Sequence, residues 1–190
     1  MTNESSSDGR YAPLPDKALE LCRMTGAPPR LVAHLTLVHD AARRLVNGVH
    51  AVFPALKFDE EAIYFGAATH DLGKTIHSVE LSESGMLHES RGVELLRELG
   101  VPEDLARFAY THNNWTGSVS VKIEDLLVAL ADKCWKGKRV TDLETLATET
   151  LAELTGIPQW HYYAVLDDLL QDLASDADAR LEWQRSFPLI

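Results

Sequence analysis

Hydrophobic residues recur every three or four positions along most of this chain, which is the spacing of one face of an α-helix. The longest such pattern covers residues 29–52. Leu31, Val38 and Leu45 share one face of this predicted helix. His34 lies on the same face, so we expect its side chain to point into the core. No segment shows the strict alternation of polar and hydrophobic residues that predicts a strand.

Asp59 has the character of an N-cap, and Glu60 and Glu61 follow it in a first turn where the helix dipole favours acidic residues. The helix that begins there is apolar nearly all round, so we expect it to form the buried centre of the fold. Gly73 is expected to let the chain turn after it. This central helix covers residues 62–71. The remaining predicted helices cover residues 16–24, 88–99, 102–113, 124–135, 142–154, 158–174 and 176–183.

The sequence therefore predicts an all-α fold, a compact bundle of about seven to nine helices. We expect three parts along the chain. Residues 1–15 are rich in Ser, Gly and Pro without periodicity and predict a flexible tail. Residues 16–175 form the main domain, and residues 176–190 form a C-terminal helical extension.

Composition narrows the choice of function. A length of 190 residues with 45% hydrophobic content suits one globular domain. The formal net charge of −11 argues against binding a nucleic-acid polymer, which usually requires a basic face. Two cysteines are too few for a disulfide framework, and no apolar run approaches the ~20 residues that span a bilayer. With no signal peptide at its start, the chain is expected in the cytoplasm. No feature of the sequence specifies the oligomeric state.

The candidate chemistry centres on the adjacent pair His70-Asp71, within the segment Gly-Ala-Ala-Thr-His-Asp-Leu-Gly-Lys. One histidine on an apolar helix face is more often a hydrogen-bonded core residue than a ligand. Burying several such groups without a cation is costly, however, because each unpartnered polar group costs roughly 1–3 kcal/mol. Four nitrogen and two carboxylate ligands suffice for two divalent transition ions. The predicted ligands are His34, His70, Asp71, His88, His112 and Asp132.

The order His…His-Asp…His…His…Asp, with Leu-Gly-Lys directly after the doublet, resembles the HD-domain superfamily of metal-dependent phosphohydrolases. The resemblance covers roughly residues 28–139. Residues 31–38 look like the first-ligand helix of the family, and residues 130–133 look like the helix with its last aspartate. His88 and His112 match the two extra histidines of the binuclear branch.

The resemblance implies a role for each ligand. Asp71 bridges two ions, His34, His70 and Asp132 complete one position, and His88 and His112 complete the other. One or two ions of Fe, Mn, Zn, Ni or Co suit such ligands. Water held between two cations is readily deprotonated and can act as a hydroxide nucleophile. The expected enzyme is a hydrolase of a phosphate ester or anhydride, with a small, nucleotide-like phosphorylated substrate.

Positive residues beside the ligands are candidates for substrate contact. Lys74 follows the doublet and is expected to neutralise charge on the phosphoryl group, although a lysine there also suits the end of a helix. A basic cluster follows Asp132, and from it we predict Lys136 and Arg139 as substrate contacts. Trp115 either stacks on a base or packs at the rim of the core. The histidines without a predicted role, His39, His50, His77 and His161, are expected to be solvated.

Two other classes of function stay open. The same four histidines and two aspartates serve mixed-valent di-iron oxygenases of the HD fold, so the ligands alone do not separate hydrolysis from oxygen insertion. A non-enzymatic signalling or binding module is the third possibility, although such proteins usually lose ligands. Residues 113–117 read Asn-Asn-Trp-Thr-Gly, without the second histidine and the Gly-Tyr-Pro signature of cyclic-di-GMP phosphodiesterases, which argues against that activity.

Overall fold

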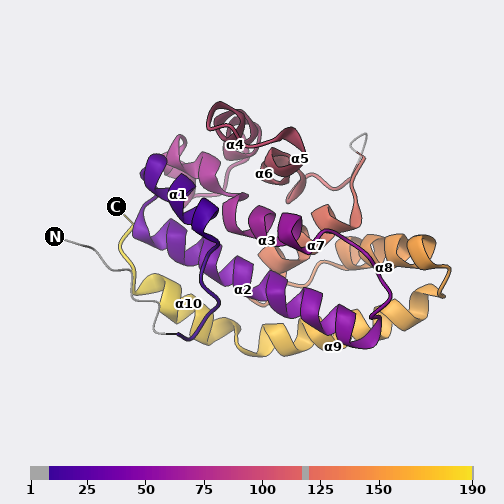
Figure 1. Cartoon of the computed structure of the whole chain (residues 1–190). Helices are drawn as coiled ribbons and strands as arrows, with labels where there is room; N and C mark the ends of the chain where they lie inside the picture. The colour runs from indigo at the N-terminus through magenta and orange to yellow at the C-terminus, as the bar shows by residue number, and fades with distance from the viewer. Residues whose placement is uncertain (1–8, 117–119, 190) are drawn as a thin grey trace.

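The computed structural model describes residues 9–116 and 120–189, and these residues form helices without any strand (Figure 1). The all-α prediction is confirmed. The elements in order are α1 (Asp16–Met24), α2 (Pro29–Val52), α3 (Glu60–Thr69), the 3-10 helices η1 (Leu72–Thr75) and η2 (Ser78–Leu81), α4 (Leu87–Glu98), α5 (Glu103–Ala106), α6 (Phe108–Thr111), α7 (Ile123–Cys134), α8 (Thr141–Thr155), α9 (Gln159–Ser175) and α10 (Ala177–Arg185).

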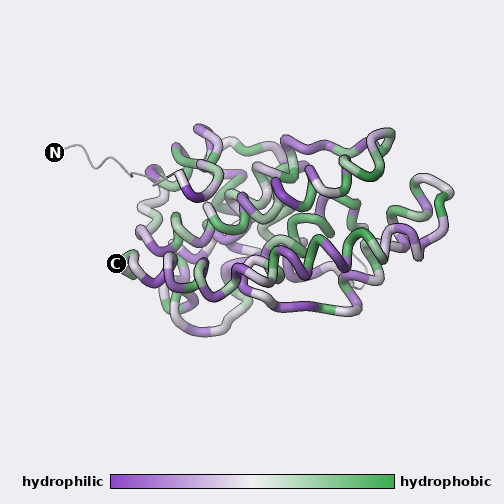
Figure 2. The backbone as a smooth tube through the Cα atoms, turned by 90° about the horizontal axis from the view of Figure 1, so that it is seen from below, coloured by the Kyte–Doolittle hydropathy of each residue, from purple (hydrophilic) through white to green (hydrophobic). Residues whose placement is uncertain are grey.

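Helices α2, α3 and α7 contact one another and form the centre of the bundle. Leu45, Ile63 and Leu127, one from each helix, are fully buried. The prediction that the α3 segment forms the buried centre is therefore confirmed. In Figure 1, α9 and α10 run along one side of α2, while α4, α5 and α6 lie on the opposite side of α3. The mixture of hydrophobic and hydrophilic residues along each helix is visible in Figure 2.

The buried side chains form two hydrophobic clusters. The larger one joins α2 and α3 to α7, α8 and α9, and includes Val38 and Leu130. The smaller one joins α1 and the start of α2 to α4, α5 and α6, and includes Leu35 and Leu72. Because Leu35 and Val38 are three residues apart on α2, the two clusters meet along this helix. The predicted metal ligands come from helices of both clusters, for example His88 from α4 and Asp132 from α7.

The helix predicted over residues 102–113 is divided into α5 and α6 at Arg107. The guanidinium of Arg107 donates to the buried carboxylate of Asp125 at the start of α7, with Nε 2.9 Å from Oδ1. The hydroxyl of Thr111 donates to the same Oδ1 atom at 2.7 Å. These contacts fasten α5 and α6 to α7, a tertiary constraint that the hydrophobic spacing does not contain.

Both ends of the described chain pack on the bundle. Residues 1–8 of the predicted tail lie outside the described residues, but Leu14 is buried and the ring of Tyr11 lies against Trp183, with centroids 4.9 Å apart. Helix α10 contacts α2 and α9. The fully buried Arg180 in α10 donates through Nη1 to the carbonyl of Leu173 at 2.6 Å. No described helix has the length and hydrophobicity needed to cross a membrane.

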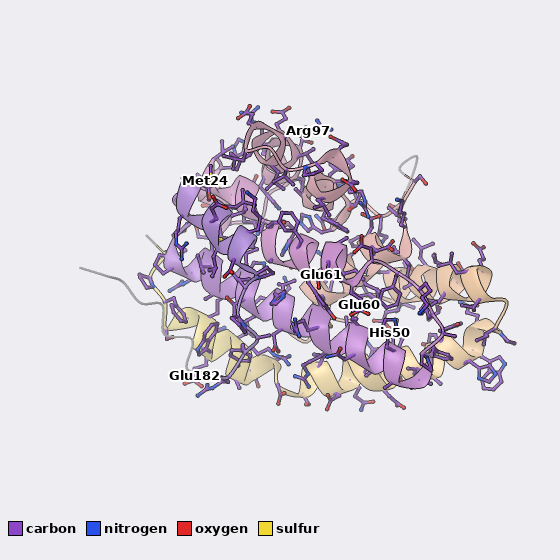
Figure 3. The ribbon with its side chains drawn as sticks, in the orientation of Figure 1. Met24, His50, Glu60, Glu61, Arg97 and Glu182 are labelled. Atoms are coloured by element: carbon purple, nitrogen blue, oxygen red, sulfur yellow. The ribbon has the colours of Figure 1, made fainter. Side chains whose placement is uncertain are left out.

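The histidines without a predicted role differ in their surroundings. His161 is exposed, and His50 and His77 are half-buried. His50 Nδ1 lies 3.1 Å from Glu60 Oε1, which joins the end of α2 to the start of α3 (Figure 3). For His39 the prediction is wrong, because this side chain is buried against Tyr64. Burial lowers the pKa of His39 to about 4.

Candidate metal centre

The doublet lies at the end of α3, where the helix gives way to η1. The carboxylate of Asp59 caps α3, accepting from the amide of Ala62 at 3.0 Å. His70 is the last residue with a helical hydrogen bond in this segment, and Asp71 begins the tighter turn. Gly73 lies in η1, where the chain turns after α3 as expected, but it does so without a positive φ. A side chain there would meet the backbone of α4, because a Cβ atom would lie 2.0 Å from the carbonyl oxygen of His88.

The structure brings all six predicted ligands together. They come from different elements: α2, the α3–η1 junction, the first turn of α4, the residue after α6, and the last turns of α7. Every one of them is buried. The exposed fractions are 8% for His34, 0% for His70, 2% for Asp71, 4% for His88, 3% for His112 and 6% for Asp132.

The carboxylate of Asp71 divides these side chains into two sets. Its Oδ2 atom lies 3.0 Å from Nε2 of His34 and 3.6 Å from Nε2 of His70. Its Oδ1 atom lies 3.1 Å from Nε2 of His88 and 3.7 Å from Nε2 of His112. Each carboxylate oxygen thus faces its own pair of imidazoles.

Asp132 belongs to the first of these sets. Its Oδ1 atom lies 3.7 Å from His34 Nε2 and 3.6 Å from His70 Nε2. Its other oxygen, Oδ2, accepts from the Lys133 ammonium at 2.7 Å. The same ammonium also donates to Oδ1 of Asn113 at 3.1 Å. Lys133 therefore holds the outer oxygen of Asp132 and leaves the inner one facing the imidazoles.

Three of the rings are oriented by bonds at their other nitrogen. Nδ1 of His70 is 3.0 Å from the carbonyl of Ala67, and Nδ1 of His112 is 3.2 Å from the carbonyl of Phe108. Nδ1 of His88 is 2.5 Å from Oε2 of Glu80. A proton on Nδ1 satisfies each bond and leaves the Nε2 lone pair directed at the centre, which is the tautomer that a metal requires.

Glu80 and Glu89 are buried or half-buried acids around the second set that the sequence analysis did not identify. Glu80 lies in η2 and also accepts from the backbone amides of Leu87 and His88, both at 3.1 Å. Glu89 accepts from the side-chain amides of Asn113 at 2.7 Å and Asn114 at 2.5 Å. Both acids thus tie α4 to neighbouring loops. In the sequence, Glu89 could have been noticed because it directly follows His88, whereas Glu80 has no such signal.

The electrostatics favour ionised carboxylates in the centre. Burial by itself raises the pKa of Asp71, but electrostatic interactions with the His70 side chain and the Lys74 ammonium hold it well below its usual range. Burial likewise raises the pKa of Asp132, while the hydrogen bond and charge of His70 and the charge of Lys133 hold it well below the usual range. Both aspartates are therefore negative at neutral pH and suited to bind cations.

The histidines of the two sets titrate differently. Burial lowers the pKa of His34, and burial with the neighbouring His70 lowers the pKa of His112 to about 3. Burial also acts to lower the pKa of His88, but its contacts with Asp71 and Glu80 raise it above the ordinary value. His34 and His112 are thus neutral at physiological pH, whereas His88 retains affinity for a proton.

The donor atoms fit a metal centre. Asp71 Oδ1 and His88 Nε2 are buried and, among the described residues, neither makes a hydrogen bond of suitable geometry, although they lie 3.1 Å apart. Buried groups in this condition are stabilised by a cation. Among the described residues, the sets His34/His70/Asp132, His70/Asp71/His112 and His88/Glu89/His112 each bring three donor atoms within reach of one ion. Imidazole with carboxylate suits divalent transition ions.

Two adjoining cavities, of about 190 and 170 Å³, open beside the centre. His34, Asp71, Lys74 and Lys136 line both. Lys74 Nζ lies 2.5 Å from Oδ2 of Asp71, and the pKa of Lys74, which burial lowers, is raised above its ordinary value by that carboxylate. Lys74 and Lys136 thus lie beside the predicted ligands, and their contact with a substrate stays a prediction.

The other two predicted substrate contacts are not brought to the cavities. Arg139 is bound by acids on α8 and α9, with Nη2 2.7 Å from Glu144 Oε2 and 2.6 Å from Asp167 Oδ1. Trp115 is half-buried against the larger hydrophobic cluster, with Lys133 Nζ 5.6 Å from the centroid of its ring. Arg139 is therefore engaged in an ion-pair network, which its place in a basic run of sequence did not reveal.

Comparison with known proteins agrees with this geometry. A family model described as HD domain matches residues 32–135, which is more than half of the chain. Comparison with curated proteins and with solved structures gave no significant match. The matched segment begins just before His34 and ends just after Asp132, so it includes all six side chains. With these side chains gathered at one buried centre, the chain belongs to the HD domain family, a superfamily of metal-dependent hydrolase type.

Proposed function

We propose that this protein is a phosphohydrolase that uses two divalent transition ions to cleave a phosphate ester or anhydride of a small molecule. The observation that supports this best is the division of the ligands by Asp71, whose two oxygens face different pairs of imidazoles at 3.0–3.7 Å. We assign His34, His70 and Asp132 to one ion and His88 and His112 to the other, with Asp71 between them. Fe, Mn, Zn, Ni and Co all suit this set.

The protein's own residues would prepare the site for an anionic substrate. Bound ions would supply Lewis-acid activation of a phosphoryl oxygen and of water. The ammonium groups of Lys74 and Lys136 line the cavities beside them, and Lys133 lines the second cavity. These charges would bind and orient the phosphoryl group and offset the negative charge that develops on it. They also offset, locally, a formal net charge of −11 that would otherwise repel such a substrate.

We expect the manganese-loaded protein to release phosphate, or a nucleoside phosphate, under strictly anaerobic conditions. Hydrolysis needs no change of metal valence, so it should persist when iron and oxygen are both absent. The measurement is phosphate release from a panel of phosphate esters and anhydrides in a glove box. Product that forms only with iron and oxygen, together with the spin signal of a mixed-valent iron pair, would replace hydrolysis with oxygen insertion.

The same assay gives a matched pair of lysine variants. Lys136→Ala should lower kcat/KM by about tenfold or more, because a charged group lining the cavity is lost. Lys138→Ala removes the same charge from an exposed position two residues away that lines neither cavity, and should leave kcat/KM within about twofold. Equal effects of the two substitutions would place the phosphoryl group elsewhere.

Occupancy of the second ion should fall first as the pH is lowered. A proton and a metal compete for Nε2 of His88, whose raised pKa means that it takes up a proton at higher pH than His34 or His112. As the pH falls through the range in which His88 takes up a proton, metal content after dialysis should decline from two ions per chain toward one. Elemental analysis across this range makes the measurement.

Glu80→Gln supplies the control for this pH dependence. The amide can still accept from Nδ1 of His88 but no longer contributes the negative charge that raises its pKa. The loss of the second ion should then move to lower pH. Simultaneous loss of both ions at one pH, unaffected by Glu80→Gln, would contradict the assignment of His88 to a separate position.

A further inference from the structure

We infer that the cavity of about 190 Å³ binds the organic part of the substrate, and that the segment after α10 forms its wall and selects a compact, largely apolar group. This inference rests on the proposed phosphohydrolase function and specifies its substrate class. The segment after α10, residues 186–189, lies beyond the stretch that the family model matches, so this selectivity would belong to this chain rather than to the family as a whole.

The start of α2 holds this segment in place. The backbone amide of Arg30 donates to the carbonyl of Pro188 at 3.0 Å, and its Nε donates to the carbonyl of Phe187 at 2.9 Å. Nη2 of the same guanidinium lies 3.3 Å from the carbonyl of Arg185. An amide in the first turn of a helix has no partner within that helix, so the C-terminal segment satisfies it. Arg30 thus binds two consecutive carbonyls of the wall, those of Phe187 and Pro188, and the carbonyl of Arg185 at the end of α10.

Aromatic contacts support the segment from the other side. The ring of Phe187 lies against Trp183 of α10, with centroids 4.8 Å apart, and Trp183 in turn lies against Tyr11. The segment is therefore packed between the start of α2 and an aromatic group on α10. A wall held in this way can present a side chain at a fixed place, which selectivity requires.

The two cavities differ in what they offer a ligand. The cavity of about 170 Å³ is lined mainly by ionic and amide groups, including His88, Asn113, Asp132 and Lys133. The cavity of about 190 Å³ adds hydrophobic side chains from four separate parts of the fold: Leu31, Leu81, Trp135 and Leu189. Since both share His34, Asp71, Lys74 and Lys136, a ligand with its phosphoryl group at the centre can extend from the polar cavity toward these hydrophobic side chains.

This arrangement favours a substrate with a phosphoryl group attached to a compact apolar or aromatic body. Leu31, Leu81 and Leu189 offer apolar surface that rewards burial of an apolar group, and the charged side chains of the same lining lie beside it. Gln184, from α10, also lines this cavity and provides an amide that can bond to a single polar substituent. Inorganic phosphate would use only the polar part of the site.

Calorimetric titration of the manganese-loaded full-length protein tests this inference with two probes, phenylphosphonate and inorganic phosphate. Phenylphosphonate should bind at least fivefold more tightly than phosphate. Leu189→Asn should remove most of that difference and leave the manganese content unchanged. Leu154→Asn, at an exposed leucine near the end of α8, should bind both probes like the unaltered protein.

Arg30→Lys is the second variant, because it keeps the positive charge but loses the Nε contact with the Phe187 carbonyl. Like Leu189→Asn, it should lower the affinity for phenylphosphonate. It therefore tests the wall even if Leu189→Asn unfolds at a lower temperature than the unaltered protein. If both variants bound phenylphosphonate as tightly as the unaltered protein, residues 186–189 would not form a selective wall. If the unaltered protein bound the two probes equally, the cavity would not bind an apolar group. Failure of phosphate itself to bind would overturn the proposed function instead.

Discussion

Asp71→Ala is expected to empty the metal centre and to lower phosphate release by at least about a hundredfold. Removal of an outer-shell partner alone costs about 10–100-fold in metal affinity or activity, and Asp71 touches every part of the centre. Its two oxygens lie 3.0 Å from His34 Nε2 and 3.1 Å from His88 Nε2, so this one carboxylate contacts both sets of imidazoles. Elemental analysis and the anaerobic phosphate assay measure the two effects.

The contrast with single-set variants makes this test specific. His88→Ala should release mainly the second ion, and Asp132→Ala mainly the first, whereas Asp71→Ala should release both. Asp168→Ala, at an exposed position on α9, is the control and should retain full metal content. If Asp71→Ala kept one ion with the affinity of the unaltered protein, Asp71 would not be a bridging ligand and the two-ion proposal would need a different geometry.

Gly73→Ala is expected to produce the largest structural effect of any single methyl group added near the centre. The new Cβ would lie 2.0 Å from the His88 carbonyl oxygen and 2.8 Å from the Gly92 amide nitrogen, and both are backbone atoms of α4. Overpacking of this kind typically costs about 1–3 kcal/mol and sometimes more. Because the backbone cannot rotate away, α4 must shift and take His88 with it. The second ion should therefore be lost while the first is retained.

Gly48→Ala is the matched control for this substitution. Its Cβ would also come too close to a neighbour, at 2.3 Å, but that neighbour is the end of the Leu169 side chain. A side chain can change rotamer, and alanine within α2 gains up to about 1 kcal/mol of helix propensity over glycine. Thermal or denaturant unfolding of both variants measures the difference. A smaller loss of stability for Gly73→Ala than for Gly48→Ala would contradict the close packing of η1 on α4.

The convergence of six side chains of ligand type could be predicted from the sequence, because several of them occupy positions that local pattern controls. His34 lies on the apolar face of a long helix, His70 and Asp71 end the most apolar helix, and Asp132 lies in another strongly apolar one. Helical spacing fixes which side of an element is buried. Six polar side chains of ligand type at such positions, in that order, predict that they meet at one buried site.

What could not be predicted depends on contacts between distant parts of the chain. Arg139 belongs to a basic run in the sequence, but its direction is set by Glu144 and Asp167 on other helices. His39 is buried because residues near it in space, not in sequence, cover it. Glu80 comes from a short turn without periodicity, so nothing local marks it as the partner of His88. A run of charged residues or a single histidine in the sequence does not show which distant residues will contact it.

The two hydrophobic clusters both contribute helices to the proposed metal centre, so bound metal would affect the stability of the whole domain. His88 lies on α4, a helix of the smaller cluster, and Asp132 lies on α7, a helix of the larger one. Ions bound by both would act as a non-covalent cross-link, in addition to the apolar contacts and the bonds of Asp125 to Arg107 and Thr111. A ligand that binds only the folded chain at a hundred times its dissociation constant adds about 2.7 kcal/mol of stability. If the proposed ions bind, folding and metal loading would be linked, and removal of the metal should lower the free energy of unfolding as well as the proposed activity.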